Sequence, residues 1–155
     1  VHPQGKIPSA NVAGLMLFES AAICEYFCDL HPSNQLLAES GSSQRATHSQ
    51  WTSFAQSEIE AYRWHNFQLD RTGQEGNSFA TVKDLNIRIA SSGLKVINSH
   101  LETHEYFGGP FFTLTDIVVG WTLNWARRSE LTGDFPAIEA YLAKLLSRPY
   151  CSLAK

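Results

Sequence analysis

The sequence lacks a long hydrophobic run, because its longest uncharged apolar stretch, residues 117–126, falls far short of the roughly 20 residues that a membrane helix needs. The N-terminus has no apolar signal-peptide core, and no N-x-[ST] glycosylation motif occurs. Cysteines number only three, an odd count. These absences predict a cytoplasmic protein in a reducing compartment, without a membrane association.

An excess of basic charge is also missing, since 12 Lys and Arg residues stand against 15 Asp and Glu residues, for a net charge of −3. This balance gives no electrostatic reason to expect nucleic-acid binding. Hydrophobic residues make up 43% of the chain, which is too apolar for a disordered segment and favours a packed core. The sequence contains no P-loop, dinucleotide fingerprint, G-x-S-x-G or H-E-x-x-H motif.

Two pairs of potential metal ligands stand four residues apart, Cys24 with Cys28 and His100 with His104. Helical spacing would put each pair on one face, but no second pair follows at the spacing of a metal site. We therefore expect no metal, and we interpret Cys24 as a small buried apolar residue.

The first thirty residues predict a β-hairpin followed by a helix. Short strands are expected over residues 6–10 and 15–18, and a helix begins near residue 21 with Ser20 as candidate N-cap. Residues 32–43 are rich in Ser, Gly and other polar residues, which is typical of a linker. Beyond the linker, apolar residues recur at helical spacing in four segments: 44–70, 80–103, 113–128 and 135–148.

The sharpest local motif is a capping box at the third of these helices. Thr113 can cap the exposed N–H groups of the helix start, and Asp116 can reach back to the N–H of Thr113. Phe112 and Ile117 flank the box as a hydrophobic staple. Capping accounts fully for Asp116, so we assign it a structural role.

Two further features permit ligand binding. The N–H groups of a helix start after Glu19 and Ser20 can hold a carboxylate, and Glu19 can hold an ammonium, although plain helix capping is the simpler explanation. The backbone at Ile7, before Pro8, can pair with an extended peptide-like ligand, or it can simply be an edge strand.

These segments, together and in this order, resemble the glutathione transferase superfamily, and most of all its bacterial and fungal members. The resemblance implies a mainly α protein: an all-helical C-terminal domain, residues 44–155, preceded by the second half of a thioredoxin-like α/β domain, residues 1–31, and a linker, residues 32–43. The family's opening strand, helix and strand, which carry the Tyr, Ser or Cys that stabilises the glutathione thiolate, have no counterpart in the sequence. We therefore assign no catalytic residue.

The resemblance implies a role for each residue of the N-terminal motifs. Ser20 would bind the γ-glutamyl carboxylate of glutathione, and Glu19 its ammonium. The main chain of Ile7 would pair with the cysteinyl part, with Pro8 as a cis-proline setting the turn. Lys6 would approach the glycyl carboxylate.

The family's second-substrate pocket lies between its first and third long helices. The aromatic candidates there are Tyr62, Trp64, Trp121 and Trp125, each of which core packing would also explain. The implied function is detoxifying conjugation of the glutathione thiol to a small hydrophobic electrophile by a homodimer, with glutathione as cosubstrate and no other cofactor. The alternatives are a non-catalytic scaffold and a glutathione-dependent reductase, isomerase or peroxidase.

Overall fold

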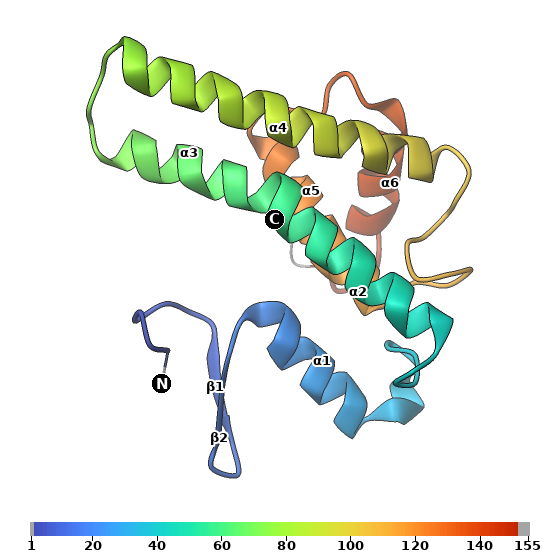
Figure 1. Cartoon of the computed structure of the whole chain (residues 1–155). Helices are drawn as coiled ribbons and strands as arrows, with labels where there is room; N and C mark the ends of the chain where they lie inside the picture. Colours follow the sequence, from blue (N-terminus) through green and yellow to red (C-terminus); the bar gives the residue numbers. More distant parts are fainter. Residues whose placement is uncertain (1, 152–155) are drawn as a thin grey trace.

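The structure, a computed structural model, describes residues 2–151 and places a hairpin and one helix beneath a bundle of longer helices (Figure 1). The mainly helical class expected from the sequence is therefore confirmed, with the hairpin and helix ahead of the helical part. The elements are β1 (Ser9–Val12), β2 (Leu15–Phe18), α1 (Ser20–Leu30), the 3₁₀ turn η1 (Pro32–Asn34), α2 (Ser43–Ala55), the π-helical turn η2 (Gln56–Glu60), α3 (Ala61–Arg71), α4 (Asn77–Leu101), α5 (Leu114–Arg128) and α6 (Pro136–Leu146).

The hairpin pairs β1 and β2 antiparallel, with Ser9 opposite Phe18. Its turn is closed by Asn11, whose side-chain oxygen accepts a hydrogen bond from the N–H of Gly14 at 2.9 Å. The prediction of a strand over residues 6–10 is wrong in its bounds, because β1 begins at Ser9 and ends at Val12. Pro8 has no N–H to donate to a strand ladder, and the Ile7–Pro8 peptide bond is cis.

Helix α1 begins one residue earlier than the sequence indicated. Glu19 is the N-cap, with φ 70°, and Ser20 is the first helical residue, so the assignment of Ser20 as N-cap is wrong. The Glu19 side chain makes no capping hydrogen bond. As a result, the first-turn N–H groups of α1 are capped by neither side chain and remain available to a ligand.

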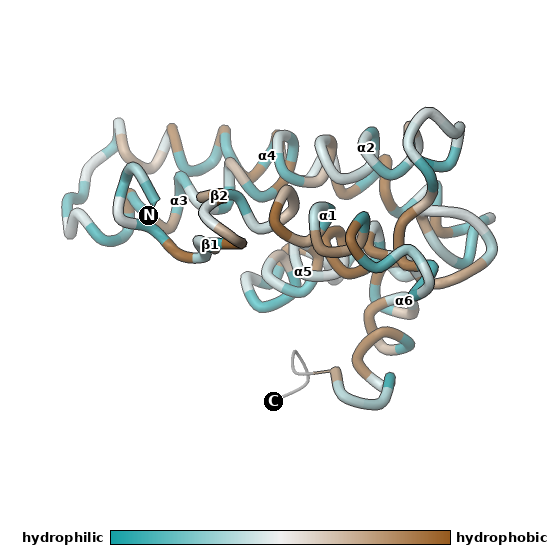
Figure 2. Tube along the Cα trace, turned by 90° about the horizontal axis from the view of Figure 1, so that it is seen from below, coloured by the Kyte–Doolittle hydropathy of each residue, from teal (hydrophilic) through white to brown (hydrophobic). Residues whose placement is uncertain are grey.

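The segments α2, η2 and α3 form one continuous helical rod that runs beside α4 (Figure 1). The core is centred on this contact, where Ile59, Leu94 and Ile97 are fully buried together with Leu123 of α5. Gly93 permits the close approach, because a Cβ there would lie 2.9 Å from Cγ1 of Ile59. The loop that joins α3 to α4 lies at the far edge of the molecule and is hydrophilic (Figure 2).

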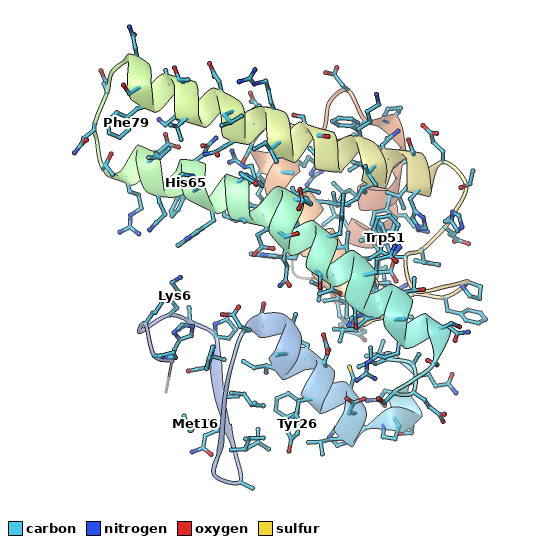
Figure 3. The ribbon with its side chains drawn as sticks, viewed as in Figure 1. Lys6, Met16, Tyr26, Trp51, His65 and Phe79 are labelled. Carbon is cyan, nitrogen blue, oxygen red and sulfur yellow. The ribbon has the colours of Figure 1, made fainter. Side chains whose placement is uncertain are left out.

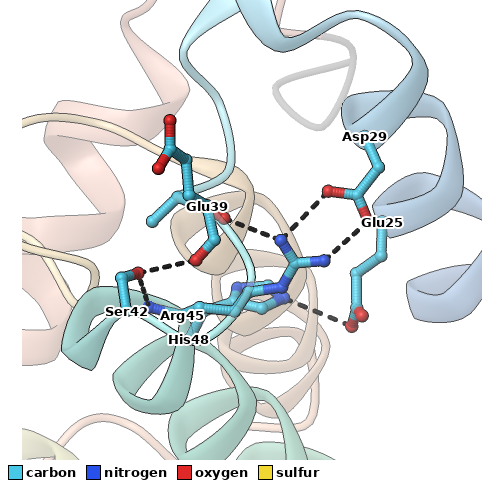
Figure 4. A network of polar contacts seen from close by, with 7 residues as sticks. Glu25, Asp29, Glu39, Ser42, Arg45 and His48 are labelled. Carbon is cyan, nitrogen blue, oxygen red and sulfur yellow. Dashed lines mark hydrogen bonds and ion pairs between the residues drawn. The ribbon is translucent and has the colours of Figure 1, made fainter.

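Polar contacts join α1, which follows the hairpin, to α2, the first helix of the rod (Figure 4). The Arg45 guanidinium donates to both carboxylate oxygens of Asp29, at 3.0 and 2.6 Å, and to the carbonyl of Ala38 at 2.7 Å. His48 is buried and lies within hydrogen-bond distance of Thr115 and Glu25, at 2.8 and 3.3 Å. The network fixes the position of α1 against the helical rod.

The start of α5 has the geometry of a capping box. The carboxylate of Asp116 accepts hydrogen bonds from the N–H of Thr113 at 2.8 Å and from its hydroxyl at 3.1 Å. The same carboxylate, which is fully buried, also accepts from the N–H of Phe107 and from the hydroxyl of Tyr141. Asp116 therefore ties α6 and the loop before α5 to the helix start.

No helix within residues 2–151 combines the length and the apolar character needed to cross a membrane.

Candidate functional site

A cleft of about 410 Å³ has the N-terminal loop and the start of α1 on one side and the helical rod on the other. One wall contains all five residues that the sequence singled out for glutathione: Lys6, Ile7, Pro8, Glu19 and Ser20. The structure therefore brings these residues together, although they come from the N-terminal loop and the start of α1. Their individual roles in binding stay predictions.

The start of α1 gives this wall its capacity for anions. The first N–H groups of a helix have no intrahelical partner, and the helix dipole places about half a positive charge there. The helical residues of the first turn include no acidic side chain to oppose an anion. The hydroxyl of Ser20, the first helical residue, adds one more donor at the same point.

The N-terminal loop carries the remaining groups of this wall. Ile7 is 93% exposed, so its backbone is open to an extended ligand. The Lys6 ammonium points towards α3 and lies 5.6 Å from the centre of the Trp64 ring (Figure 3). A cation over an aromatic face at this distance is weakly attracted, so Lys6 can leave the ring for a stronger anionic partner.

Only one of the four aromatic candidates for the second substrate lines the cleft. This residue is Trp64, which contacts the rings of Phe67 and Trp125 at 5.4 and 6.4 Å. Trp125 therefore supports the cleft from behind. Tyr62 is half-buried and Trp121 is 52% exposed, and neither lines the cleft.

The opposite wall holds residues that sequence reasoning missed. These residues are Gln56, Glu60 and Ala61 of the helical rod, and His2 of the N-terminal loop also lines the cleft. Oε2 of Glu60 accepts a hydrogen bond from the buried hydroxyl of Thr122 at 2.7 Å. Gln56 and Glu60 bound the π-helical turn η2, and π-turns inside helices are frequent at functional sites. No local sequence signal marks such a turn.

The thiols of Cys24 and Cys28 are not candidates for the reaction centre. Burial raises the pKa of Cys24 and of Cys28 above the ordinary thiol value, so both stay protonated near neutral pH. Neither residue lines the cleft. Within residues 2–151, no group of three or more His, Cys, Asp or Glu side chains is arranged to hold a metal ion.

Comparison with known proteins places this geometry in a family. Residues 79–149 match the family model for the glutathione S-transferase C-terminal domain. The chain is 31% identical to the probable elongation factor 1-gamma 1 of Arabidopsis thaliana over 161 residues, which cover 96% of this chain and 36% of that protein. The chain thus spans about a third of the length of this relative and of the similar elongation factor 1-gamma 2 of the same plant.

Two bacterial glutathione transferases match over a larger share of their own length. The chain is 26% identical to the glutathione S-transferase GstA of Escherichia coli O157:H7, covering 96% of this chain and 72% of that protein. It is 31% identical to a solved glutathione transferase family member from Pseudomonas fluorescens Pf-5, with a TM-score of 0.78, covering 95% of this chain and 69% of that one. That structure holds two bound glutathione molecules.

Proposed function

The chain belongs to the glutathione transferase superfamily, and from this premise we propose that its cleft binds glutathione and presents the thiol to a small hydrophobic electrophile. The observation that carries the proposal is the meeting of Lys6, Ile7, Pro8, Glu19 and Ser20 in one cleft at a helix start. The free cysteines among residues 2–151 support a reducing, cytoplasmic setting, in which conjugation would serve detoxification.

Each polar part of the tripeptide has a complementary group in the cleft. Ser20 and the first-turn N–H groups of α1 hold the γ-glutamyl carboxylate, and Glu19 holds the ammonium. The main chain of Ile7 pairs with the cysteinyl part, and Lys6 moves from the Trp64 ring to the glycyl carboxylate. Glutathione is the cosubstrate, and the proposal requires no other cofactor.

Conjugation requires the thiol to lose its proton, because the thiolate is the nucleophile and an unperturbed thiol has a pKa of about 8.5. The sulfur then attacks the electrophilic carbon, and the leaving group departs. Among residues 2–151, the cleft wall includes no Tyr or Cys, and Ser20 is committed to the carboxylate. We therefore assign no thiol-activating residue.

Retention on immobilised glutathione tests the binding. We expect the protein to be retained and to elute with free glutathione, and Ser20→Ala to be retained at least tenfold less. Ser78→Ala is the matched control, because Ser78 is an exposed serine in the first turn of α4, outside the cleft. Passage of the wild-type protein through the column would contradict the proposal.

A second candidate function is a non-catalytic scaffold. The specific observation in its favour is the 31% identity to a relative whose name is that of an elongation factor rather than a transferase. Turnover of a chlorinated nitrobenzene with glutathione separates the two candidates, since the product absorbs light at a new wavelength. Binding of glutathione without turnover of several electrophile classes, including peroxides and disulfides, favours the scaffold.

We also propose a homodimer formed through α4. Three exposed apolar residues of this helix, Val82, Leu85 and Val96, lie along or beside a groove of about 460 Å³. Glu58 and Arg88 line the same groove, so a two-fold axis could pair each with the other on the second copy. Such a pairing would make the face complementary to itself.

Light scattering tests the dimer. Leu85→Glu is expected to give a particle of half the wild-type mass, whereas Ala80→Glu, at an exposed position of α4 outside the groove, keeps the wild-type mass. A wild-type monomer at micromolar concentration would contradict this part of the proposal.

A further inference from the structure

We propose that Glu60 makes the cleft selective for a second substrate that carries a positive charge close to its apolar body. This inference rests on the proposed function, because it assigns a specificity to the same cleft. Glu60 lines the cleft from the side opposite the glutathione residues, where the π-helical turn η2 passes into α3.

The carboxylate of Glu60 is held in place by a buried group. Its Oε2 accepts a hydrogen bond from Thr122 at 2.7 Å, and Thr122 is only 1% exposed. Lys6 and His2 line the same cleft, and in the part of the chain that the structure describes neither of them forms an ion pair with Glu60. The carboxylate therefore has a fixed direction, and neither basic side chain of the described cleft wall pairs with it.

When glutathione is bound, the carboxylate of Glu60 is left without an ion-pair partner on the described walls of the cleft. Glu19 is matched by the ammonium of glutathione and Lys6 by the glycyl carboxylate, while the start of α1 takes the second carboxylate. Glu60 then faces whatever ligand fills the rest of the cleft. A cation there is attracted by the carboxylate, and an anion is repelled.

Trp64 supplies the surface on which such a cation can rest. It lies four residues after Glu60 on the same helical rod, so the two side chains share a face. Ala61, between them in the sequence, lines the same cleft with a side chain of a single methyl group. The ammonium of Lys6, 5.6 Å from the ring centre, shows that the Trp64 face is accessible to a cation.

A matched pair of probes isolates the effect of charge from that of shape. 3-(Trimethylammonio)phenol and 3-tert-butylphenol have nearly the same size and differ by one positive charge. With glutathione present, NMR titrations of the protein are expected to show about tenfold tighter binding of the cation, from the combined carboxylate and aromatic attraction. Glu60→Gln keeps a hydrogen-bond acceptor for Thr122 and is expected to reduce the preference to threefold or less.

Glu75→Gln is the control variant, because Glu75 is an exposed carboxylate in the loop between α3 and α4 and lines neither the cleft nor the groove beside α4. It should keep the tenfold preference. Equal affinity of the wild-type protein for both probes overturns the inference, as does an unchanged preference in Glu60→Gln.

Calorimetry with glutathione on the same preparations separates this outcome from failure of the proposed function. Glutathione uptake without a preference for the cation overturns the selectivity alone. A preference for the cation in the absence of any glutathione uptake overturns the proposed function and leaves the charge selectivity of the cleft standing.

Discussion

Replacement of Asp116 by Asn is expected to lower the free energy of unfolding by about 3 kcal/mol, because a buried carboxylate that accepts four hydrogen bonds is exchanged for an amide. Its four donors are two N–H groups, of Phe107 and Thr113, and two hydroxyls, of Thr113 and Tyr141. An amide oxygen can serve donors on one side only, and the amide nitrogen then faces donors on the other.

The magnitude follows from the individual bonds. A hydrogen bond to a charged group contributes roughly 1.5–3 kcal/mol, and a buried donor left without an acceptor costs about 1–3 kcal/mol. At least one bond is lost and one donor is stranded, so we expect about 3 kcal/mol, within the 5–15 kcal/mol total of a typical domain. The variant should therefore fold.

Urea unfolding, followed by tryptophan fluorescence, measures this change. The midpoint is expected to fall with the slope unchanged. Asp134→Asn is the control, since Asp134 is exposed, and it should change the free energy by less than about 0.5 kcal/mol. Tyr141→Phe, which removes one of the four donors, should cost less than Asp116→Asn. A loss below 1 kcal/mol for Asp116→Asn would refute the reasoning.

Two further predictions concern packing and pH. Gly93→Ala should destabilise the protein by about 1–3 kcal/mol, because the new Cβ would lie 2.9 Å from Cγ1 of Ile59. Gly120→Ala should destabilise it less, because the nearest neighbour of its new Cβ is the flexible end of the Leu145 side chain. The urea midpoints of the two variants measure the difference, and equal losses of stability would contradict the packing argument. The Arg45 guanidinium lowers the pKa of Asp29, so their ion pair stabilises the fold above the usual carboxyl pKa of about 3.9, and this contribution is lost as the pH falls through the lowered value. Because Asp29 is largely exposed, this contribution is below about 1 kcal/mol. When the free energy of unfolding is measured at decreasing acidic pH, Arg45→Ala should lose less of it than the wild-type protein, by up to that amount. The same loss in both proteins would show that the ion pair contributes nothing.

Local motifs in the sequence were sufficient to locate most of the helical part. The periodic apolar residues and the Thr113 and Asp116 pair are signals within one or two turns, and the structure places helices at each of them. The start of α1 was misplaced by one residue because Glu19 adopts φ 70°, which a non-glycine residue rarely does.

The opposite wall of the cleft could not be predicted. Gln56 and Glu60 lie four residues apart and share a face of the rod, but which face meets the cleft depends on how η2 packs against α4 and α5 rather than on the local residues. The bond from Tyr141 to Asp116 joins residues 25 apart, and no periodicity indicates such a pair. The aromatic candidates were chosen by type alone, which explains why Tyr62 and Trp121 lie outside the cleft.

The most direct test of the central claim is a calorimetric titration of glutathione into the protein and into Ser20→Ala, with circular dichroism to show that both are folded. The account predicts a saturable signal at one site per chain for the wild-type protein and an affinity at least tenfold weaker for the variant, because the carboxylate loses a donor at the start of α1. The same affinity in both proteins would contradict the claim that the tripeptide binds at this helix start.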